Sequence, residues 1–132
     1  MKLPIMKLID SLYTIIDSNL ENSSCHYTVR LNPEHFIYAA HFPGEPITPG
    51  VCIMQTGIEL MEKACGLPLE LECARNVKFL KVISPSEITV VCYSLDRFIV
   101  EQDRVSCQIS VTAEGILYAK LSLVCRISGR VR

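Results

Sequence analysis

The sequence predicts an α+β fold in which an antiparallel sheet of about six strands wraps around one long central helix. Three observations carry this prediction. Residues 51–65 contain no proline, begin with an apolar run and end at Gly66, as a buried helix would. Two strand-like segments precede this helix and four follow it. Turn residues separate the later strands at intervals of about 10–12 residues, which is typical of antiparallel hairpins.

The first two strands are predicted on either side of a turn. Residues 8–20 carry Leu, Tyr and Ile in a strand-like run, and Asn22-Ser23-Ser24 is typical of a turn. Residues 25–31 form the second predicted strand. Asn32-Pro33-Glu34-His35 then predicts a short helical turn, with the asparagine as its cap and the proline at the first helical position.

A loop is predicted between this helical turn and the central helix. The segment from His41 to Gly50 contains three prolines and two glycines, which exclude a helix interior or a central strand. The helix that follows is apolar on every side from Val51 to Met54, which predicts that it is buried all round. Polar residues enter only from Gln55 onward.

Four strands are predicted after Pro68, at residues 71–83, 87–97, 104–113 and 116–127. Ser84-Pro85-Ser86 and Glu114-Gly115 separate neighbouring strands, and Asp96-Arg97 followed by Glu101-Gln102-Asp103 marks a third turn.

Length and composition limit the class of protein. A chain of 132 residues predicts a single domain that spans residues 1–132. Thirteen Lys and Arg against fourteen Asp and Glu give a net charge of -1, which excludes a basic nucleic-acid-binding protein. Hydrophobic residues make up 49% of the chain, which is high for a small monomer and indicates buried subunit contacts, a hydrophobic ligand, or both.

The cysteines and the N-terminus indicate a cytoplasmic protein. Seven cysteines, an odd number without a CxxC spacing, predict neither a disulfide framework nor a zinc ribbon. Most of them lie in apolar segments, as small buried side chains of a reducing compartment do. No apolar run approaches the roughly 18 residues of a membrane span, and the first residues lack a stretch typical of a signal peptide.

The segment from His41 to Glu59 carries the candidate chemistry. A proline-rich loop delivers a histidine next to the start of a buried helix, where the free N–H groups of Gly50 and Val51 can polarise a carbonyl oxygen. Histidine can accept or donate a proton near neutral pH. Gln55 lies four residues before the glutamate on one helix face. A carbonyl polariser beside a base is what removal of a proton next to a carbonyl requires.

These residues carry a resemblance to a known family. The run His41-Phe42-Pro43-Gly44-Glu45-Pro46-Ile47-Thr48-Pro49-Gly50-Val51 resembles the HFPGxPxxPGV signature of the 3-hydroxyacyl-[acyl carrier protein] dehydratases of the FabZ/FabA type. Residues 32–35, at their spacing from the signature, are also similar to the family. So is Asn76-Val77-Lys78-Phe79-Leu80-Lys81, followed by Pro85 and Glu87. The resemblance extends from about residue 8 to residue 127.

The resemblance implies a hotdog fold, with the long helix enclosed by the curled sheet. It also implies a homodimer, or a hexamer built as a trimer of dimers, with two equivalent sites at the subunit interface. One subunit would give a histidine and the other an acidic residue of the helix. The substrate would be a 3-hydroxyacyl thioester on the phosphopantetheine arm of an acyl carrier protein, and loss of water would give the trans-2-enoyl thioester. The resemblance implies no metal and no diffusible cofactor.

The family's roles transfer residue by residue onto the signature. His41 would be the base that removes the proton at C2. The N–H of Gly50 or Val51 would hold the thioester oxygen. Phe42 and Pro49 would complete the substrate-binding loop.

One position departs from the family in a way that affects the chemistry. The helix residue that is Glu or Asp in the family is Gln55 here, and glutamine has no titratable proton. Glu59 stands where the family often has Gln. Three interpretations follow: Gln55 hydrogen-bonds the departing hydroxyl, Glu59 replaces the missing carboxylate, or catalysis is lost. An ordinary helix-surface pair with Lys63 is the alternative role for Glu59.

Basic residues after the helix have two interpretations. The candidates for binding an acidic carrier protein or the phosphopantetheine phosphate are Arg75, Lys78, Lys81, Arg126, Arg130 and Arg132. The alternative is a solvated set of edge-strand charges that prevents aggregation between sheets.

Two classes of function therefore remain. The first is a 3-hydroxyacyl-[acyl carrier protein] dehydratase in fatty-acid or related acyl or polyketide biosynthesis. The second is a catalytically weak or inactive hotdog protein that binds acyl carriers or pairs with an active subunit. A thioesterase is a third and weaker option, because hotdog thioesterases lack the HFPG loop.

Overall fold

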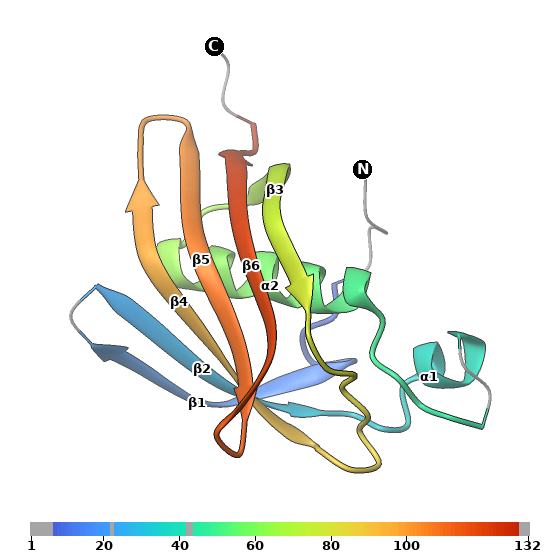
Figure 1. Cartoon of the computed structure of the whole chain (residues 1–132). Helices are drawn as coiled ribbons and strands as arrows, with labels where there is room; N and C mark the ends of the chain where they lie inside the picture. Colours follow the sequence, from blue (N-terminus) through green and yellow to red (C-terminus); the bar gives the residue numbers. More distant parts are fainter. Residues whose placement is uncertain (1–6, 22, 42–43, 130–132) are drawn as a thin grey trace.

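The computed structural model describes residues 7–21, 23–41 and 44–129, with His41 described by its backbone alone. Six strands form one antiparallel sheet, and two helices connect the second strand to the third (Figure 1). The strands are β1 (Tyr13–Glu21), β2 (Ser24–Leu31), β3 (Leu69–Phe79), β4 (Val90–Val100), β5 (Arg104–Ala113) and β6 (Ile116–Ile127). The helices are α1 (Phe36–His41) and α2 (Gly50–Cys65). The α+β prediction is confirmed.

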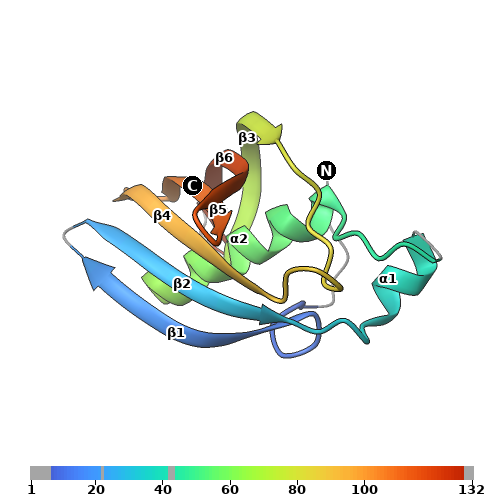
Figure 2. The ribbon, with the colours of Figure 1, turned by 60° about the horizontal axis from the view of Figure 1, so that its bottom comes forward.

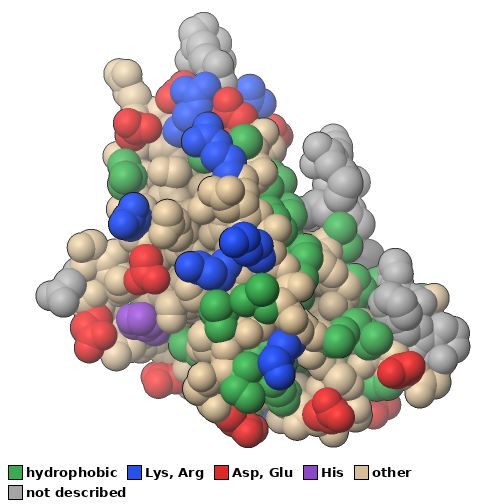
Figure 3. Space-filling view, in the orientation of Figure 1, with side chains coloured by type: hydrophobic (Ala, Val, Ile, Leu, Met, Phe, Trp, Pro, Cys, Tyr) green, Lys and Arg blue, Asp and Glu red, His purple; other side chains and the backbone are tan. Residues whose placement is uncertain are grey.

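The strand order in the sheet is β1-β2-β4-β5-β6-β3, so β1 and β3 are the two edges. Strand β3 follows α2 in the chain but pairs with the last strand, β6, whereas β4, β5 and β6 are joined by hairpins. Helix α2 runs across one face of the curved sheet, as the two ribbon views show (Figures 1 and 2). The opposite face of the sheet carries charged and polar side chains (Figure 3).

The core lies between α2 and the sheet. Strand β5 buries every second residue from Val105 to Ala113, and β6 does the same from Leu121 to Ile127. The helix approaches β5 closely at Gly57, where an added Cβ would stand 2.9 Å from the Cδ1 atom of Ile109. Glycine at this position therefore allows the helix to lie directly on the sheet.

The last two predicted strands agree with the structure, and the others differ at their ends. Strands β5 and β6 have the predicted bounds, whereas β3 and β4 are displaced from the predicted segments. Of the third predicted turn, Glu101-Gln102-Asp103 is confirmed between β4 and β5, whereas Asp96-Arg97 forms no turn, because both residues lie inside β4. The pairing of β4 with β5 is irregular between Asp96 and Ile99, and Arg97 has a φ of 51°. A β-bulge inserts extra residues without ending the strand, so polar residues at this point do not mark a turn.

The first predicted strand begins later than expected. Residues 10–12 form a turn instead of a strand, Ile9 makes an isolated bridge to Tyr13, and β1 starts only at Tyr13. Asp10 has a φ of 65°, a left-handed conformation that Asp tolerates better than most residues. The chain therefore reverses beside α2 before it enters the sheet.

Helix α2 ends as predicted and is less buried than predicted. Gly66 has a φ of 73°, and its N–H donates to the carbonyl of Glu62 at 2.7 Å. Cys52 is buried, but Val51 is 40% exposed, because the sheet covers one face of the helix only. The helical residues are divided between the 16-residue α2 and the 6-residue α1, so the prediction of one long central helix holds only in part. No helix in the described ranges has the length and apolar character needed to cross a membrane.

Helix α1 starts later than the sequence predicts. Asn32 caps the turn, and its Oδ1 accepts the N–H of Glu34 at 3.0 Å, but Pro33 lies in this turn and not in the helix. His35 is buried, and its Nδ1 accepts the N–H of Ile37 at 3.1 Å. The histidine thus supplies the acceptor at the start of α1.

We expect this cap to weaken in acid. Burial lowers the pKa of His35 below its ordinary value of 6.5, so the unfolded chain binds a proton there more readily than the folded one. The stability contributed by the neutral ring is complete above about pH 6.5 and is lost as the pH falls toward the lower, folded-state pKa. His35→Asn retains an acceptor for the Ile37 N–H but does not titrate. Urea unfolding between about pH 7 and pH 5 should show a smaller loss of unfolding free energy in the variant than in the wild type. Equal losses would contradict the assignment.

Candidate functional site

The N-terminus of α2 has free backbone donors. Pro49 is the N-cap residue, in an extended conformation with φ -63° and ψ 147°, and no side chain caps the helix. Its carbonyl accepts the N–H groups of Cys52 at 2.9 Å and Ile53 at 3.1 Å. Within the described residues, no acceptor is recorded for the N–H groups of Gly50 and Val51. These two groups can bind an oxygen that carries negative charge, and the positive end of the helix dipole favours that charge.

A cavity of about 350 Å³ opens beside this helix end. Pro49 and Gly50 line it from the helix side, and residues 79–83, at the end of β3 and just after it, line it from the other side. The ring of Phe79 lies over the glycine, where an added Cβ would stand 2.9 Å from two ring atoms. The lining is mostly apolar, so the cavity fits a hydrophobic chain next to a polar helix end.

The loop before α2 is fixed at Thr48. Its N–H donates to the carbonyl of Ile83 at 2.8 Å, which ties the loop to the opposite wall of the cavity. Its hydroxyl and that of Tyr38 on α1 form a buried hydrogen bond of 3.0 Å. Burial raises the pKa of Tyr38, which keeps this phenol neutral at physiological pH.

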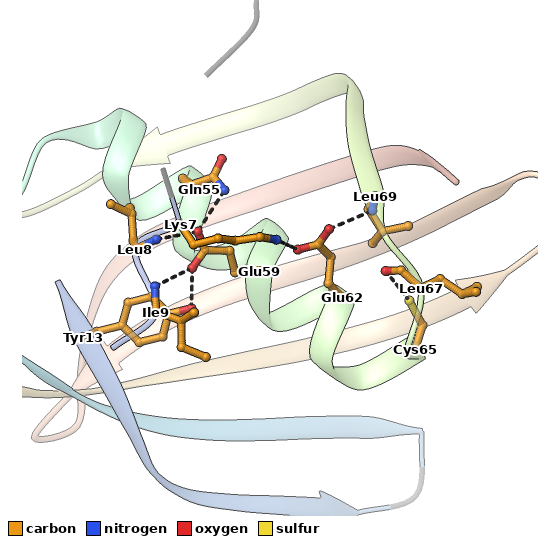
Figure 4. A network of polar contacts seen from close by, with 10 residues as sticks. All are labelled: Lys7, Leu8, Ile9, Tyr13, Gln55, Glu59, Glu62, Cys65, Leu67 and Leu69. Carbon is orange, nitrogen blue, oxygen red and sulfur yellow. Dashed lines mark hydrogen bonds and ion pairs between the residues drawn. The ribbon is translucent and has the colours of Figure 1, made fainter. Parts of the chain in front are cut away.

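The most extensive polar cluster on α2 surrounds Glu59, which is only 4% exposed (Figure 4). Its Oε1 accepts the N–H of Ile9 at 2.9 Å and the hydroxyl of Tyr13 at 2.8 Å. Its Oε2 accepts the N–H of Leu8 at 2.8 Å and the Nε2 of Gln55 at 3.0 Å. Two hydrogen bonds on each oxygen satisfy the carboxylate fully.

This cluster tethers the segment that we call the N-terminal strap, residues 7–12. Lys7 forms an ion pair of 2.6 Å with Oε1 of Glu62, one helical turn beyond Glu59. The other oxygen of Glu62 accepts the N–H of Leu69 at 2.8 Å. Burial and the neighbouring carboxylate of Glu59 both raise the pKa of Tyr13, so its hydroxyl remains a donor.

The predicted catalytic residues fall into two groups. Gln55 and Glu59 are hydrogen-bonded to each other, but neither lines the cavity at the start of α2. The surface pair predicted as the alternative for Glu59 is not formed: the carboxylate is buried, and its recorded partners do not include Lys63. His41 is the last residue of α1, with its side chain outside the described part of the chain. Phe42 lies outside the described residues altogether.

The predicted substrate-binding and basic residues are more scattered. Pro49 and Gly50 line the cavity, and Val51 is exposed on the next position of the helix. Lys81 belongs to the cavity wall. Lys78 instead lines a second hollow of about 240 Å³, which also includes residues of β5 and β6. Arg75 is exposed on β3, and Arg130 and Arg132 lie outside the described residues.

Sequence reasoning missed the N-terminal strap. The run of residues 8–20 reads as one strand, so the contacts of Leu8, Ile9 and Tyr13 with the helix were not expected. A usable signal was present in Asp10-Ser11, a polar pair that interrupts an otherwise apolar run and coincides with the turn.

Comparisons with known proteins show which family this chain resembles in sequence. The family model described as ApeI-like, ApeI dehydratase, matches residues 17–117. A protein named 3-hydroxyacyl-[acyl-carrier-protein] dehydratase FabZ from Lactobacillus helveticus is 26% identical over 91% of this chain and 89% of its own length. A FabZ protein of the same name from Wolbachia pipientis is 29% identical over 73% of this chain and 71% of its own.

Solved structures share the fold. The dehydratase heterocomplex ApeI:P from Xenorhabdus doucetiae superimposes with a TM-score of 0.68 at 14% identity, over 86% of this chain and 97% of that one. A hypothetical thioesterase with coenzyme A from Streptococcus pneumoniae has a TM-score of 0.62 at 12% identity, over 91% of this chain and 88% of that one. The fold is thus shared by proteins with dehydratase and with thioesterase names.

The family follows from the match over most of the chain and not from the fold alone. The family model covers the signature loop, the whole of α2 and strands β2 to β5, together with parts of β1 and β6. The predicted resemblance to dehydratases of the FabZ type is confirmed, and the chain belongs to the ApeI-like dehydratase family.

Proposed function

We propose that the protein dehydrates 3-hydroxyacyl thioesters carried on acyl carrier protein and forms the trans-2-enoyl thioester. The observation that carries the proposal is the helix end at Gly50 and Val51, where two N–H groups with no acceptor among the described residues stand beside an apolar cavity. The signature loop that begins at His41 leads directly into this helix end. The FabZ names of the sequence relatives support the same reaction.

The proposed mechanism uses one titrating residue. His41 removes the proton at C2, while an N–H of Gly50 or Val51 holds the thioester oxygen as it gains negative charge. The C3–O bond breaks, the double bond forms between C2 and C3, and the imidazolium returns the proton to the leaving hydroxide as water. Gln55 hydrogen-bonds the departing hydroxyl without titrating. Glu59 is not available for this step, because four donors already occupy its oxygens.

We also propose a homodimer, or a hexamer built from such dimers, in which the site is completed across the interface. Large hydrophobic side chains are exposed around the cavity at Val51, Phe79, Leu80 and Val82, which is unfavourable for a free surface. Pairing of two subunits would cover this patch. It would also allow the histidine of one subunit to act with Gln55 of the other.

The acyl carrier protein is the proposed partner. Arg104 and Arg126 are paired with Glu72 and Glu70, so their charges are used within the sheet. In contrast, no acidic partner is recorded among the described residues for Arg75, Lys78 or Lys81. Basic groups of this kind attract an acidic partner. The seven free cysteines support a cytoplasmic setting for this reaction.

A second candidate function rests on Gln55. With an amide where the family has a carboxylate, the chain would be a weak or inactive subunit that binds acyl carriers or pairs with an active dehydratase. The heterocomplex named in the Xenorhabdus doucetiae structure supports this alternative.

The reaction can be tested by hydration of a crotonyl thioester, followed through loss of the enoyl absorbance. The wild type should be active, and His41→Ala should reduce turnover by about 10²–10⁴-fold because a positioned base is lost. Unchanged thermal unfolding would show that the variant is folded. An active His41→Ala protein would contradict the assignment, and release of free thiol in place of hydration would indicate a thioesterase.

The exchange of Gln55 and Glu59 gives a second test. Gln55→Glu alone restores a titratable group but places it against the Glu59 carboxylate, at a position now bonded at 3.0 Å. Two carboxylates this close share a proton, which raises the pKa of the restored carboxyl and makes it a poorer proton donor. The double variant Gln55→Glu/Glu59→Gln removes that conflict. Its turnover in the same assay should exceed that of the wild type and of both single variants. A double variant no faster than Gln55→Glu would refute this interpretation.

The dimer can be tested by sedimentation equilibrium at micromolar concentration. The wild type should show a mass of at least two chains of 14.8 kDa. Val82→Asp, at a side chain that is 60% exposed near the cavity, should shift the protein toward the monomer because it places a charge in the interface. Leu20→Asp is the matched control: this leucine is 73% exposed on β1, at the far edge of the sheet, and its replacement should leave the mass unchanged. A monomeric wild type would rule out the shared site.

A further inference from the structure

We infer that Glu59 is a positioning residue, which fixes the direction of the Gln55 side-chain amide and couples it to the N-terminal strap. The inference deepens the proposed function, on which it depends only for the place of Gln55 in the site. The hydrogen bonds of Glu59 do not depend on the proposed function.

All four partners of Glu59 donate a hydrogen bond to it. Two backbone N–H groups, of Leu8 and Ile9, can only donate. The Tyr13 hydroxyl donates as well, at 2.8 Å. A set of donors around a side chain that is 4% exposed is complementary to an ionised carboxylate, which can only accept.

The hydrogen bond to Glu59 sets the direction of the Gln55 amide. Because the carboxylate of Glu59 cannot donate, the nitrogen of this amide must face it, and the bond is from Nε2 to Oε2 at 3.0 Å. The amide oxygen is consequently turned away from Glu59, as the close-up shows (Figure 4). Gln55 therefore presents a hydrogen-bond acceptor, which suits the O–H of a substrate alcohol or of a water molecule.

The N-terminal strap and the Gln55 amide share one oxygen of Glu59. Leu8 and Gln55 both donate to Oε2 of Glu59, so a displacement of the strap changes the partners of the atom that orients Gln55. The ion pair of Lys7 with Glu62 holds the same strap one turn further along α2 but does not touch the amide. This difference makes Glu62 a matched control for Glu59.

A glutamine at position 59 would not fix the direction of the Gln55 amide in the same way. It has one acceptor oxygen, whereas Leu8 and Ile9 donate to different oxygens of Glu59. When that oxygen faces Ile9, its own NH₂ group faces the N–H of Leu8 and the NH₂ group of Gln55. Relief of this contact requires the Gln55 amide to turn over and present nitrogen in place of oxygen. Glu59→Gln should thus free the amide that Glu59 holds.

The experiment measures solvent exchange of the Gln55 side-chain amide protons and of the Leu8 and Ile9 backbone amides, by ¹⁵N NMR of the full chain. Glu59→Gln should speed exchange at the Gln55 amide by at least about tenfold, since a hydrogen bond to a charged group is lost. Glu62→Gln should speed exchange at the Gln55 amide less than Glu59→Gln does, because it loosens the strap without touching the amide, while it speeds exchange at Leu69, whose N–H donates to Glu62. Unchanged exchange at Gln55 in Glu59→Gln, or an equal change in both variants, would overturn the inference.

Glu59→Asp serves if Glu59→Gln does not fold. It keeps the charge but shortens the side chain, so the carboxylate cannot reach both the strap and Gln55. Exchange at the Gln55 amide should again increase, and an unchanged rate would overturn the inference. None of these measurements requires turnover, so an inactive protein would count against the proposed reaction and not against the role of Glu59. If the protein is active, Glu59→Gln should lower kcat more than it raises KM, and the double variant Gln55→Glu/Glu59→Gln should recover kcat.

Discussion

A single buried carboxylate holds together parts of this chain that are far apart in sequence. Glu59 lies on the central helix, and its hydrogen bonds reach residues about fifty positions earlier, in the strap and at the start of β1. Removal of a charged group from water is unfavourable unless its lone pairs are satisfied, and here all of them are. The helix face that carries Gln55 is therefore fixed in relation to the first strand of the sheet. The side of α2 that the sheet leaves open is the side that this cluster organises.

The fold could be predicted well wherever the hydrophobic pattern is local. Strands β5 and β6 alternate buried and exposed residues, and their turn at Glu114-Gly115 has an unambiguous composition. The end of α2 at Gly66 was equally clear, because a left-handed residue there favours glycine. The errors arose where contacts between residues far apart in sequence determine the local structure. The bulge at Asp96-Arg97 depends on the partner strand, and the turn before Tyr13 depends on a helix some forty residues away.

The sequence predicts the residues of the candidate site, but it does not predict their bonding. The signature loop and its helix point to His41, Gly50 and Gln55 directly from sequence. The four-residue spacing of Gln55 and Glu59 placed both on one face of the helix, and their hydrogen bond confirms this. What the spacing cannot reveal is that the glutamate faces inward toward backbone N–H groups of a distant segment. Helix periodicity alone favoured the outward pairing with Lys63, because it contains no information about what packs against the helix.

The position of β3 at the edge of the sheet has a consequence for how the chain is made. Among the described residues its one partner strand is β6, which follows every other strand in the chain, and β2 pairs with β1 and β4. Helix α2 and β3 leave the ribosome well before the strands that cover their apolar surfaces. Until β6 is synthesised, the nascent chain presents a hydrophobic helix and an unpaired strand, which is the kind of species that aggregates. Non-local pairing of this type also slows folding. Slow synthesis at low temperature is therefore the condition under which this protein should be recovered in its native form.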